Sequence, residues 1–509
     1  MKNNALLKIM GIFALIGAFM ACKKDFLETD PIGKLSVDAF YKTDADALKA
    51  VMATYDILQW MYARDWNSAY LVKTFPSDES LAGGGDSGDQ PPLQELDKFT
   101  YSSGNPTITA VYQSCYYGIY RANMVINKVV QETDVRKQIV AEAKCLRAFF
   151  YFELVSMYGK VPLNLVELTP SEYGQPAAEV TEIYAQIEKD LKEAIEVLPA
   201  KSALAAEDKF RVSKGTAQTL LGKAYLYQEK WADAETYLDQ VIASNEYQLS
   251  SDYSTLFLVD QELGVESIME VMWVTTEGYD WGTFQWGGNR AMENNITWQL
   301  TGPRGDYFNA GTSGLIGGWG FNYPTAALYQ AFVDAGDTYR KASTVWNTAD
   351  LEAVGGGWSN PEAWGWDGCI RIKYATRLSE TSNAGGAVPE LNYGTNLRLL
   401  RYADVLLMAA EAKYRAGDES GALIELNKVR ERAQLADVSV SGDALFQAIV
   451  TERQLELAFE GVRFLDLIRW GLAPQVLGSK GFVTGKHELY PIPLDEIRNN
   501  PNIQQNPNY

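Results

Sequence analysis

Apolar residues recur with the period of an α-helix along most of this chain, and that period limits the fold more than any other feature. From Ala45 to Tyr62 they fall three or four residues apart, which places them on one helix face. The same spacing runs over 111–130, 139–158 and 181–198. Each such helix has an apolar stripe that it must bury. The sequence therefore predicts a mostly α-helical protein whose helices pack against one another.

One helix pair, within 213–238, carries the pattern of a tetratricopeptide repeat. The residues of that pattern are Leu221, Gly222, Tyr225, Ala234 and Leu238. A degenerate copy lies within 402–433, and the segment 147–199 resembles a third copy that is split by a loop. Pairs of this type stack because one pair alone cannot bury both of its faces. We therefore expect tetratricopeptide-like pairs within 111–250 and 400–435.

Two segments lack the helical period. Residues 77–110 contain a glycine-rich run and two adjacent prolines, and we expect them to form loops. Residues 275–400 are rich in glycine, and nine of the 13 tryptophans lie between Trp273 and Trp366. A packed helical repeat does not need this composition, whereas a long irregular segment on a helical scaffold often carries function. We expect the helix pairs to pack against an irregular Trp/Gly-rich loop region with minor β structure.

The remaining helical stretch, 444–470, contains charged residues that read as solvated or paired helix charges. They are Glu452, Arg453, Glu456 and Arg463. Cys115, Cys145 and Cys369 lie in aromatic or apolar surroundings, so they are expected to be buried free thiols.

Composition excludes several classes of function. The formal charge of −20 opposes binding to nucleic acid, which needs a basic surface. The single histidine, His487, removes nearly all histidine-based metal sites and Ser-His-Asp or Cys-His nucleophile systems, and we expect it to be structural. Asp86 and Asp89 could hold Ca²⁺, but the spacing of a calcium loop is absent, so we expect a solvated loop and no cofactor.

The N-terminus has the layout of an export signal. Lys2 and Lys8 precede an apolar run over 9–20, which is shorter than the roughly 20 residues of a membrane-spanning helix. Cys22 follows the small residue Ala21, which predicts a lipoprotein signal over 1–21, with cleavage before Cys22 and acylation of its thiol. The alternative is an ordinary signal peptide with an incidental cysteine.

Short motifs in a fixed order extend along the rest of the chain. They include Asp25-Phe26-Leu27-Glu28, Arg121-Ala122-Asn123, Ala141-Glu142-Ala143-Lys144, Tyr158-Gly159-Lys160-Val161-Pro162, Arg401-Tyr402-Ala403-Asp404, Glu452-Arg453 with Glu456, and Leu489-Tyr490-Pro491-Ile492-Pro493. Each motif alone is weak, but their order and spacing together are specific. In these motifs the chain resembles the SusD/RagB-like nutrient-uptake outer-membrane lipoproteins, over essentially everything after residue 21.

The resemblance implies a single SusD-like domain over 22–509, with a C-terminal SusD-like segment over about 440–509. It implies a protein that is lipid-anchored in the outer membrane and faces the extracellular side, as in the surface lipoproteins of Bacteroidetes. Such a protein acts as the lid of a SusC-like TonB-dependent β-barrel transporter. It binds a nutrient, commonly an oligosaccharide, and delivers it for import without cleaving it.

A sugar-binding site needs flat aromatic faces for C–H patches, and amides, carboxylates or arginine for hydroxyl groups. In proteins that resemble this one, such groups come from the loop before the Tyr112 helix and from the irregular region. Carried over by position, the aromatic and amide candidates are Tyr101, Asn105, Trp281, Trp286, Trp319 and Tyr323. Asn289 and Arg304 are the added hydroxyl partners. Trp358, Trp364 and Trp366 form a second cluster, which is expected to be a loop that packs on itself.

Two other functions remain open from the sequence. A glycoside hydrolase would use a pair of carboxylates, for which 65 acidic residues supply candidates but no evident pair. A tetratricopeptide scaffold would bind peptides, although scaffold repeats usually run in tandem and these repeats are interrupted. Release of smaller products from an oligosaccharide would favour the hydrolase, and a tight complex with a helical peptide would favour the scaffold.

Overall fold

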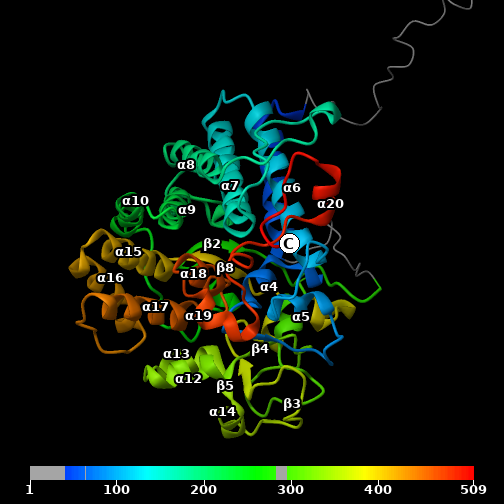
Figure 1. Ribbon diagram of the computed structural model, residues 1–509, viewed down its shortest axis with the longest axis vertical. Helices are drawn as coiled ribbons and strands as arrows, with labels where there is room; N and C mark the ends of the chain where they lie inside the picture. The colour runs from blue at the N-terminus through cyan, green and yellow to red at the C-terminus, as the bar shows by residue number, and fades with distance from the viewer. Residues whose placement is uncertain (1–39, 63–64, 283–294) are drawn as a thin grey trace, which may run out of the picture.

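The computed structural model describes residues 40–62, 65–282 and 295–509, and helices dominate these ranges (Figure 1). The long helices are α3 (Asp44–Tyr62), α6 (Pro106–Lys128), α7 (Asp134–Tyr158), α8 (Val180–Ile195), α9 (Lys214–Tyr227), α10 (Trp231–Ala243), α15 (Tyr402–Ala416), α16 (Glu419–Arg432) and α17 (Asp443–Leu457). The predicted mostly α-helical fold is confirmed. No helix of the described ranges is both long and apolar enough to cross a membrane.

The helices are arranged as packed neighbours. Helix α7 packs between α6 and α8, and α9 packs against α10. Helix α10 also contacts α15, so helix pairs from distant parts of the sequence stack side by side (Figure 1). A Cβ atom on Gly222 of α9 would lie 2.7 Å from Leu238 of α10. Gly222 therefore allows the close approach of the two helices that the repeat pattern predicts.

Side-chain caps explain why two helices begin earlier than the apolar period predicts. The Asn105 side chain accepts hydrogen bonds from the backbone N–H groups of Thr107 and Ile108, and Pro106 occupies the first turn of α6. The Thr133 side chain caps α7 in the same way. These caps extend each helix by about one turn beyond its apolar stripe.

The segments expected to be loops contain more regular structure than predicted. Residues 77–110 include strand β1 (Ser80–Ala82) and helix α5 (Pro91–Asp97). Residues 275–400 include α11 (Thr297–Thr301), β3 (Phe308–Asn309), β4 (Asn322–Pro324), α12 (Ala326–Asp334), α13 (Thr338–Thr344), β5 (Val345–Asn347), α14 (Thr348–Ala353), β6 (Gly357–Trp358), β7 (Cys369–Arg371) and most of β8 (Leu397–Arg401). These elements are too short for the sequence period to reveal.

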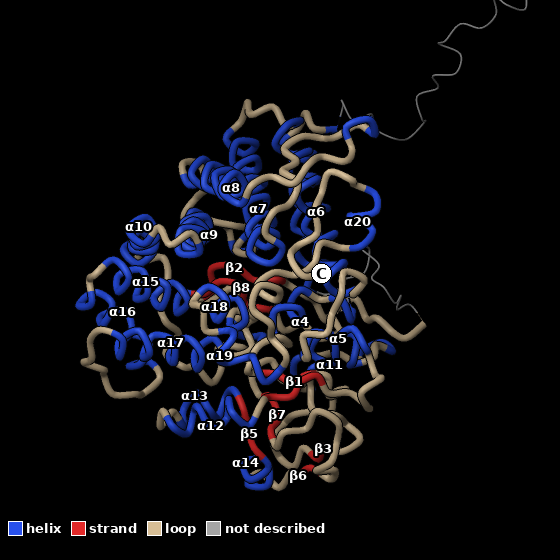
Figure 2. The backbone as a smooth tube through the Cα atoms, in the orientation of Figure 1, coloured by secondary structure: helices blue, strands red, loops and turns tan. Residues whose placement is uncertain are grey.

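The strands of the described ranges pair into two-stranded antiparallel ladders, drawn red in Figure 2. They are β1–β4, β2–β8, β3–β6 and β5–β7, with β2 over Ser267–Val271. In the β2–β8 ladder, Val271 at the end of β2 lies opposite Leu397 at the start of β8. The remaining helices are α4 (Ala69–Thr74), α18 (Arg463–Arg469), α19 (Ala473–Leu477) and α20 (Leu494–Asn499).

The helical stretch predicted over 444–470 is broken into α17 and α18. Phe459 adopts φ +60° and Gly461 adopts φ +72°, so the chain turns between the two helices. The charges of this stretch are paired and buried rather than solvated: Glu452, Arg453 and Glu456 are each at most 2% exposed. Of the two alternatives that the sequence left open, solvated or paired, the structure shows the paired one.

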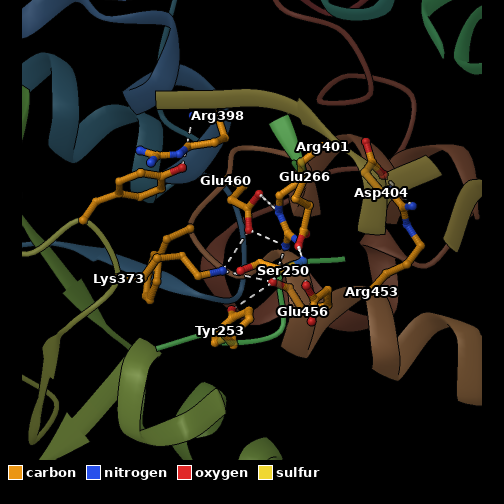
Figure 3. Close-up of polar contacts among 12 residues, drawn as sticks. Ser250, Tyr253, Glu266, Lys373, Arg398, Arg401, Asp404, Arg453, Glu456 and Glu460 are labelled. Atoms are coloured by element: carbon orange, nitrogen blue, oxygen red, sulfur yellow. Dashed lines mark hydrogen bonds and ion pairs between the residues drawn. The ribbon is translucent and has the colours of Figure 1, made fainter. Parts of the chain in front are cut away.

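Glu456 lies at the centre of a buried set of ion pairs that we call the charge network (Figure 3). It contains five acidic and five basic side chains: Glu266, Asp337, Glu452, Glu456, Glu460, Arg340, Lys373, Arg401, Arg430 and Arg432. Arg401 of β8 places its Nη1 2.5 Å from Glu456 Oε1 and its Nε 2.7 Å from Glu460 Oε2. The network joins the helical part of the chain to the irregular region.

Candidate functional site

An open cavity of about 410 Å³ lies on the irregular region, and we call it the tryptophan cavity. Its lining residues are Trp66, Asp89, Gln90, Trp281, Arg304, Gly305, Asp306, Gly318, Trp319 and Phe321. These residues come from five separate segments of the chain. The cavity is therefore assembled only in the folded protein.

Three indole rings form a stepped row along this cavity. Trp319 occupies the middle, with its ring centroid 5.7 Å from that of Trp66 and 6.0 Å from that of Trp281. The planes of the two pairs meet at 26° and 21°, so the row is gently curved. Phe321 supports Trp66 in an edge-on contact at 5.1 Å. Trp281 is 45% exposed, so the outer end of the row faces solvent.

Glycines bring two backbone segments together beneath the row. The Gly305 N–H donates to the Gly318 carbonyl at 2.9 Å, and the Trp319 N–H donates to the Gln299 carbonyl at 2.8 Å. A Cβ atom on Gly317 would lie only 2.6 Å from Gly305 Cα. The glycines of this region therefore let two backbones approach each other, and that contact fixes the position of Trp319.

Polar side chains stand beside the indole row. Arg304 Nε lies 2.8 Å from Asp306 Oδ2, which holds the guanidinium in place while leaving donors on its other nitrogens. Asp89 Oδ2 accepts a hydrogen bond of 2.8 Å from the Gly85 backbone N–H, so this carboxylate shapes the loop over 83–89. Arg304, Asp306, Asp89 and Gln90 together offer donors and acceptors next to an aromatic face.

Two of the residues predicted to contact a ligand, Trp281 and Trp319, meet at this cavity, and Arg304 lies with them. Trp66 was missed by the sequence analysis. It is a single tryptophan in the short turn between α3 and α4, and its distance of 253 positions from Trp319 hides the stacking. Cys22, Trp286 and Asn289 lie outside the described residues, so their predicted roles stay predictions.

Tyr101, Asn105 and Tyr323, which were also predicted to contact a ligand, do not line this cavity, and the structure buries all three. Tyr101 is 2% exposed and packs against the rings of His487, Tyr490 and Tyr509. Asn105 is 2% exposed and is used as the cap of α6. Tyr323 is 1% exposed, and burial raises the pKa of its hydroxyl despite the opposing effect of Arg304. An aromatic residue in a glycine-rich loop can thus be a core residue.

In the second tryptophan cluster, Trp358 and Trp366 pack on each other as predicted, whereas Trp364 packs against Gln94 and Lys98 at helix α5. The rings of Trp358 and Trp366 stack with centroids 3.8 Å apart, and Trp364 Nε1 donates to Gln94 Oε1 at 3.1 Å. His487 is buried, and its Nδ1 accepts a hydrogen bond of 2.9 Å from the Val483 backbone N–H. Burial, with a contribution from Lys486, lowers the pKa of His487 to about 4. It is neutral at physiological pH.

Among the residues that the structure describes, no group of three or more His, Cys, Asp or Glu side chains could hold a metal ion. The carboxylates of Asp86 and Asp89 accept hydrogen bonds from the Gly88 and Gly85 backbone N–H groups instead. The predicted free thiols are found: Cys115, Cys145 and Cys369 are unpaired and buried.

Comparison with known proteins finds relatives along almost the whole chain. The model of the SusD family matches residues 328–481, and a model described as "Starch-binding associating with outer membrane" matches residues 25–226. The chain is 27% identical to SusD-like protein P38 of Formosa agariphila over 98% of both chains.

Among solved structures, a laminarin binding SusD-like protein is 34% identical, with a TM-score of 0.83 over 92% of this chain and 100% of its own. Surface glycan-binding protein A from Bacteroides thetaiotaomicron, solved in complex with laminarihexaose, is 26% identical. Its TM-score is 0.77 over 91% of this chain and 99% of its own.

Proposed function

This chain belongs to the SusD family, and we propose that it captures a neutral oligosaccharide at the cell surface through its tryptophan cavity. The row formed by Trp66, Trp319 and Trp281 carries the proposal. Sugar rings stack on aromatic faces through their C–H patches, and a curved row suits a ligand of several sugar units better than a single one. Arg304 and Asp306 supply a donor and an acceptor for hydroxyl groups at the edge of the row.

The ligand that we propose first is a glucan of the laminarin type. A laminarin binding SusD-like protein is 34% identical to this chain, and a second relative was solved with laminarihexaose. The tryptophan cavity offers one lining cation, Arg304, and its guanidinium is paired with Asp306, which favours an uncharged ligand over an anionic one.

The proposed role is that of a lid on a SusC-like TonB-dependent β-barrel transporter. The chain would be anchored through lipid on Cys22 to the outer membrane, facing the extracellular side, and would deliver its ligand for import. Support comes from the signal layout over 1–21 and from the description of the matching family model, which refers to association with the outer membrane. A lid contact of this kind is expected to bury roughly 2,000 Å² or more.

We propose that the protein binds its ligand without cleaving it. Of the carboxylates in the tryptophan cavity, Asp306 is paired with Arg304 and Asp89 accepts a backbone hydrogen bond. Groups of the protein thus engage both carboxylates, whereas a glycoside hydrolase needs a pair that is free to act on the scissile bond.

Calorimetric titration tests the binding site. Protein that lacks residues 1–22 is titrated with laminarihexaose, and with maltohexaose and cellohexaose for comparison, and each mixture is examined for cleavage products. Trp319→Ala removes the middle ring of the row and is expected to weaken binding at least about tenfold, as loss of a central aromatic anchor does at other interfaces. Trp231→Ala, on α10 and outside the cavity, serves as the control. Unchanged binding by Trp319→Ala contradicts the site, and release of shorter sugars contradicts the non-enzymatic role.

The experiments that test the lipid anchor and the transporter partner need the full chain in its own host. Cys22→Ser is expected to release the protein from the membrane fraction and to abolish incorporation of labelled fatty acid. Affinity purification of the full chain is expected to recover a β-barrel transporter, and its absence would contradict the lid role while leaving glycan binding intact.

A further inference from the structure

A second cavity, of about 450 Å³, lies between helix α6, the segment 162–175 and helix α20. The two helices run close to each other in Figure 2. We call it the tyrosine pocket, and the lining residues that matter are Tyr112, Gln113, Tyr120, Tyr173, Asn164 and Glu496. It shares no lining residue with the tryptophan cavity. We propose that the tyrosine pocket is a second binding site for a neutral oligosaccharide.

Aromatic faces are available in this pocket. Tyr120 is 49% exposed and Tyr173 is 67% exposed, although rings of this size are usually covered on a protein surface. Tyr112, Tyr116 and Tyr120 follow one another at four-residue spacing, so all three lie on one face of α6. The inner two rings contact each other with centroids 5.0 Å apart, which fixes the floor of the pocket below the exposed ring.

Polar groups in the same pocket match a ligand that carries hydroxyl groups. Oδ1 of Asn164 is buried and has no hydrogen-bond partner within the described ranges. Buried polar atoms of this kind gain free energy when a ligand or water supplies the missing partner. Gln113 and Glu496 add an amide and a carboxylate, and burial raises the pKa of Glu496.

The charge of the lining residues narrows the ligand class. The lining residues include one carboxylate, Glu496, and neither lysine nor arginine. An anionic ligand would meet no cation there, and a purely apolar ligand would leave the amides unsatisfied. Tyrosine faces combined with amides therefore favour an uncharged polyhydroxylated ligand.

Both sites lie beside helix α6. Because one glycan could touch both of them, this inference rests on the proposed function. At the start of α6, Thr107 Oγ1 lies 3.2 Å from Asn67 Oδ1, next to Trp66 of the tryptophan cavity. Tyr120 follows 13 residues later, which is about 20 Å along the helix axis at 1.5 Å per residue. One polysaccharide chain that touches both sites would be held more tightly than a short oligosaccharide, because its second contact is intramolecular.

Single and combined variants separate the two sites. Calorimetry with laminarihexaose is expected to give two equivalents for the wild-type protein, one for Trp319→Ala and none for Trp319→Ala combined with Tyr120→Ala. In the Trp319→Ala background, Tyr120→Ala is expected to weaken the remaining site at least about tenfold. Tyr120→Phe keeps the ring and is expected to bind nearly as the parent does. Tyr237→Ala, on α10, is the matched control.

Each result identifies which proposal fails. In one outcome, the wild-type protein binds a single equivalent of laminarihexaose, which Trp319→Ala abolishes and Tyr120→Ala leaves unchanged. That result would overturn the second site and keep the proposed function. Binding that Tyr120→Ala abolishes and Trp319→Ala leaves unchanged would keep the tyrosine pocket and overturn the tryptophan cavity. If Tyr120→Ala instead released a protein partner and changed no sugar binding, the pocket would be a protein-docking surface and this inference would be wrong.

Discussion

Replacing Glu456 by glutamine tests the charge network without changing the volume of the side chain. Glu456 Oε2 lies 2.8 Å from Arg340 Nη1, and Glu456 Oε1 lies 2.5 Å from Arg401 Nη1 and also contacts Arg432. The residue is completely buried, so water cannot replace the lost charge. The amide removes one negative charge from a network in which five acids balance five bases.

The expected cost follows from the uncompensated charge. Removal of one partner from a buried ion pair destabilises a protein by about 3–5 kcal/mol, because the opposite charge stays buried. Desolvation alone would raise the pKa of Glu456, but Arg432, Arg401 and Arg340 outweigh it and hold the pKa well below the ordinary value of 4.5. The stabilising effect is therefore present above pH 4.5 and is lost as the pH falls through the pKa of the folded state.

Urea unfolding followed by circular dichroism measures this effect without adding salt. At pH 7, Glu456→Gln is expected to unfold at a clearly lower urea concentration than the wild type, and the difference is expected to shrink in acid. Glu431→Gln, an exposed residue of the neighbouring helix α16, is expected to change the free energy of unfolding by less than about 0.5 kcal/mol. A Glu456→Gln protein within about 1 kcal/mol of the wild type would refute the argument that the buried pairs hold this region together.

Two further predictions concern buried positions elsewhere. Burial, with a smaller effect of Asp78, raises the pKa of Glu79 to about 8, so the wild type should lose stability as the pH rises from 5 to 9, by up to about 4 kcal/mol. Glu79→Gln keeps the acceptor for the Phe459 N–H and should flatten that pH dependence; parallel curves in thermal melts would contradict this. Gly222→Val should lower the melting temperature at a cost of about 1–3 kcal/mol, because its Cβ would meet Leu238. Adding Leu238→Ala should recover part of the loss, and an unchanged melting temperature for Gly222→Val would show that α9 and α10 can separate.

The helical scaffold could be predicted because its signal is local. Apolar residues at helical spacing predicted α3, α7 and α8 to within a few residues, and small residues such as Gly222 predicted the pairing of α9 with α10. The break at Phe459 was not predictable from the apolar period. The chain turns there through the positive φ angles of Phe459 and Gly461.

The candidate site was harder to predict because exposure is a tertiary property. Trp281 and Trp319 lie at the cavity, as expected for tryptophans of the irregular region. Tyr101 and Tyr323 have the same sequence context of glycines and polar residues, yet rings from the C-terminal segment cover the first and Trp358 and Trp366 cover the second. A single sequence does not distinguish these cases.

The pairing of Val271 with Leu397 gives residues 272–396 the topology of a closed excursion from the helical scaffold. The excursion leaves at the end of β2 and returns at the start of β8, so changes within it need not move the helices that hold its base. Trp281, Arg304 and Trp319 lie in this excursion, within the stretch 227–327 that neither family model matches. Mutation can therefore exchange these side chains while the ladder and its charges stay constant, which is how one scaffold would evolve to select different ligands.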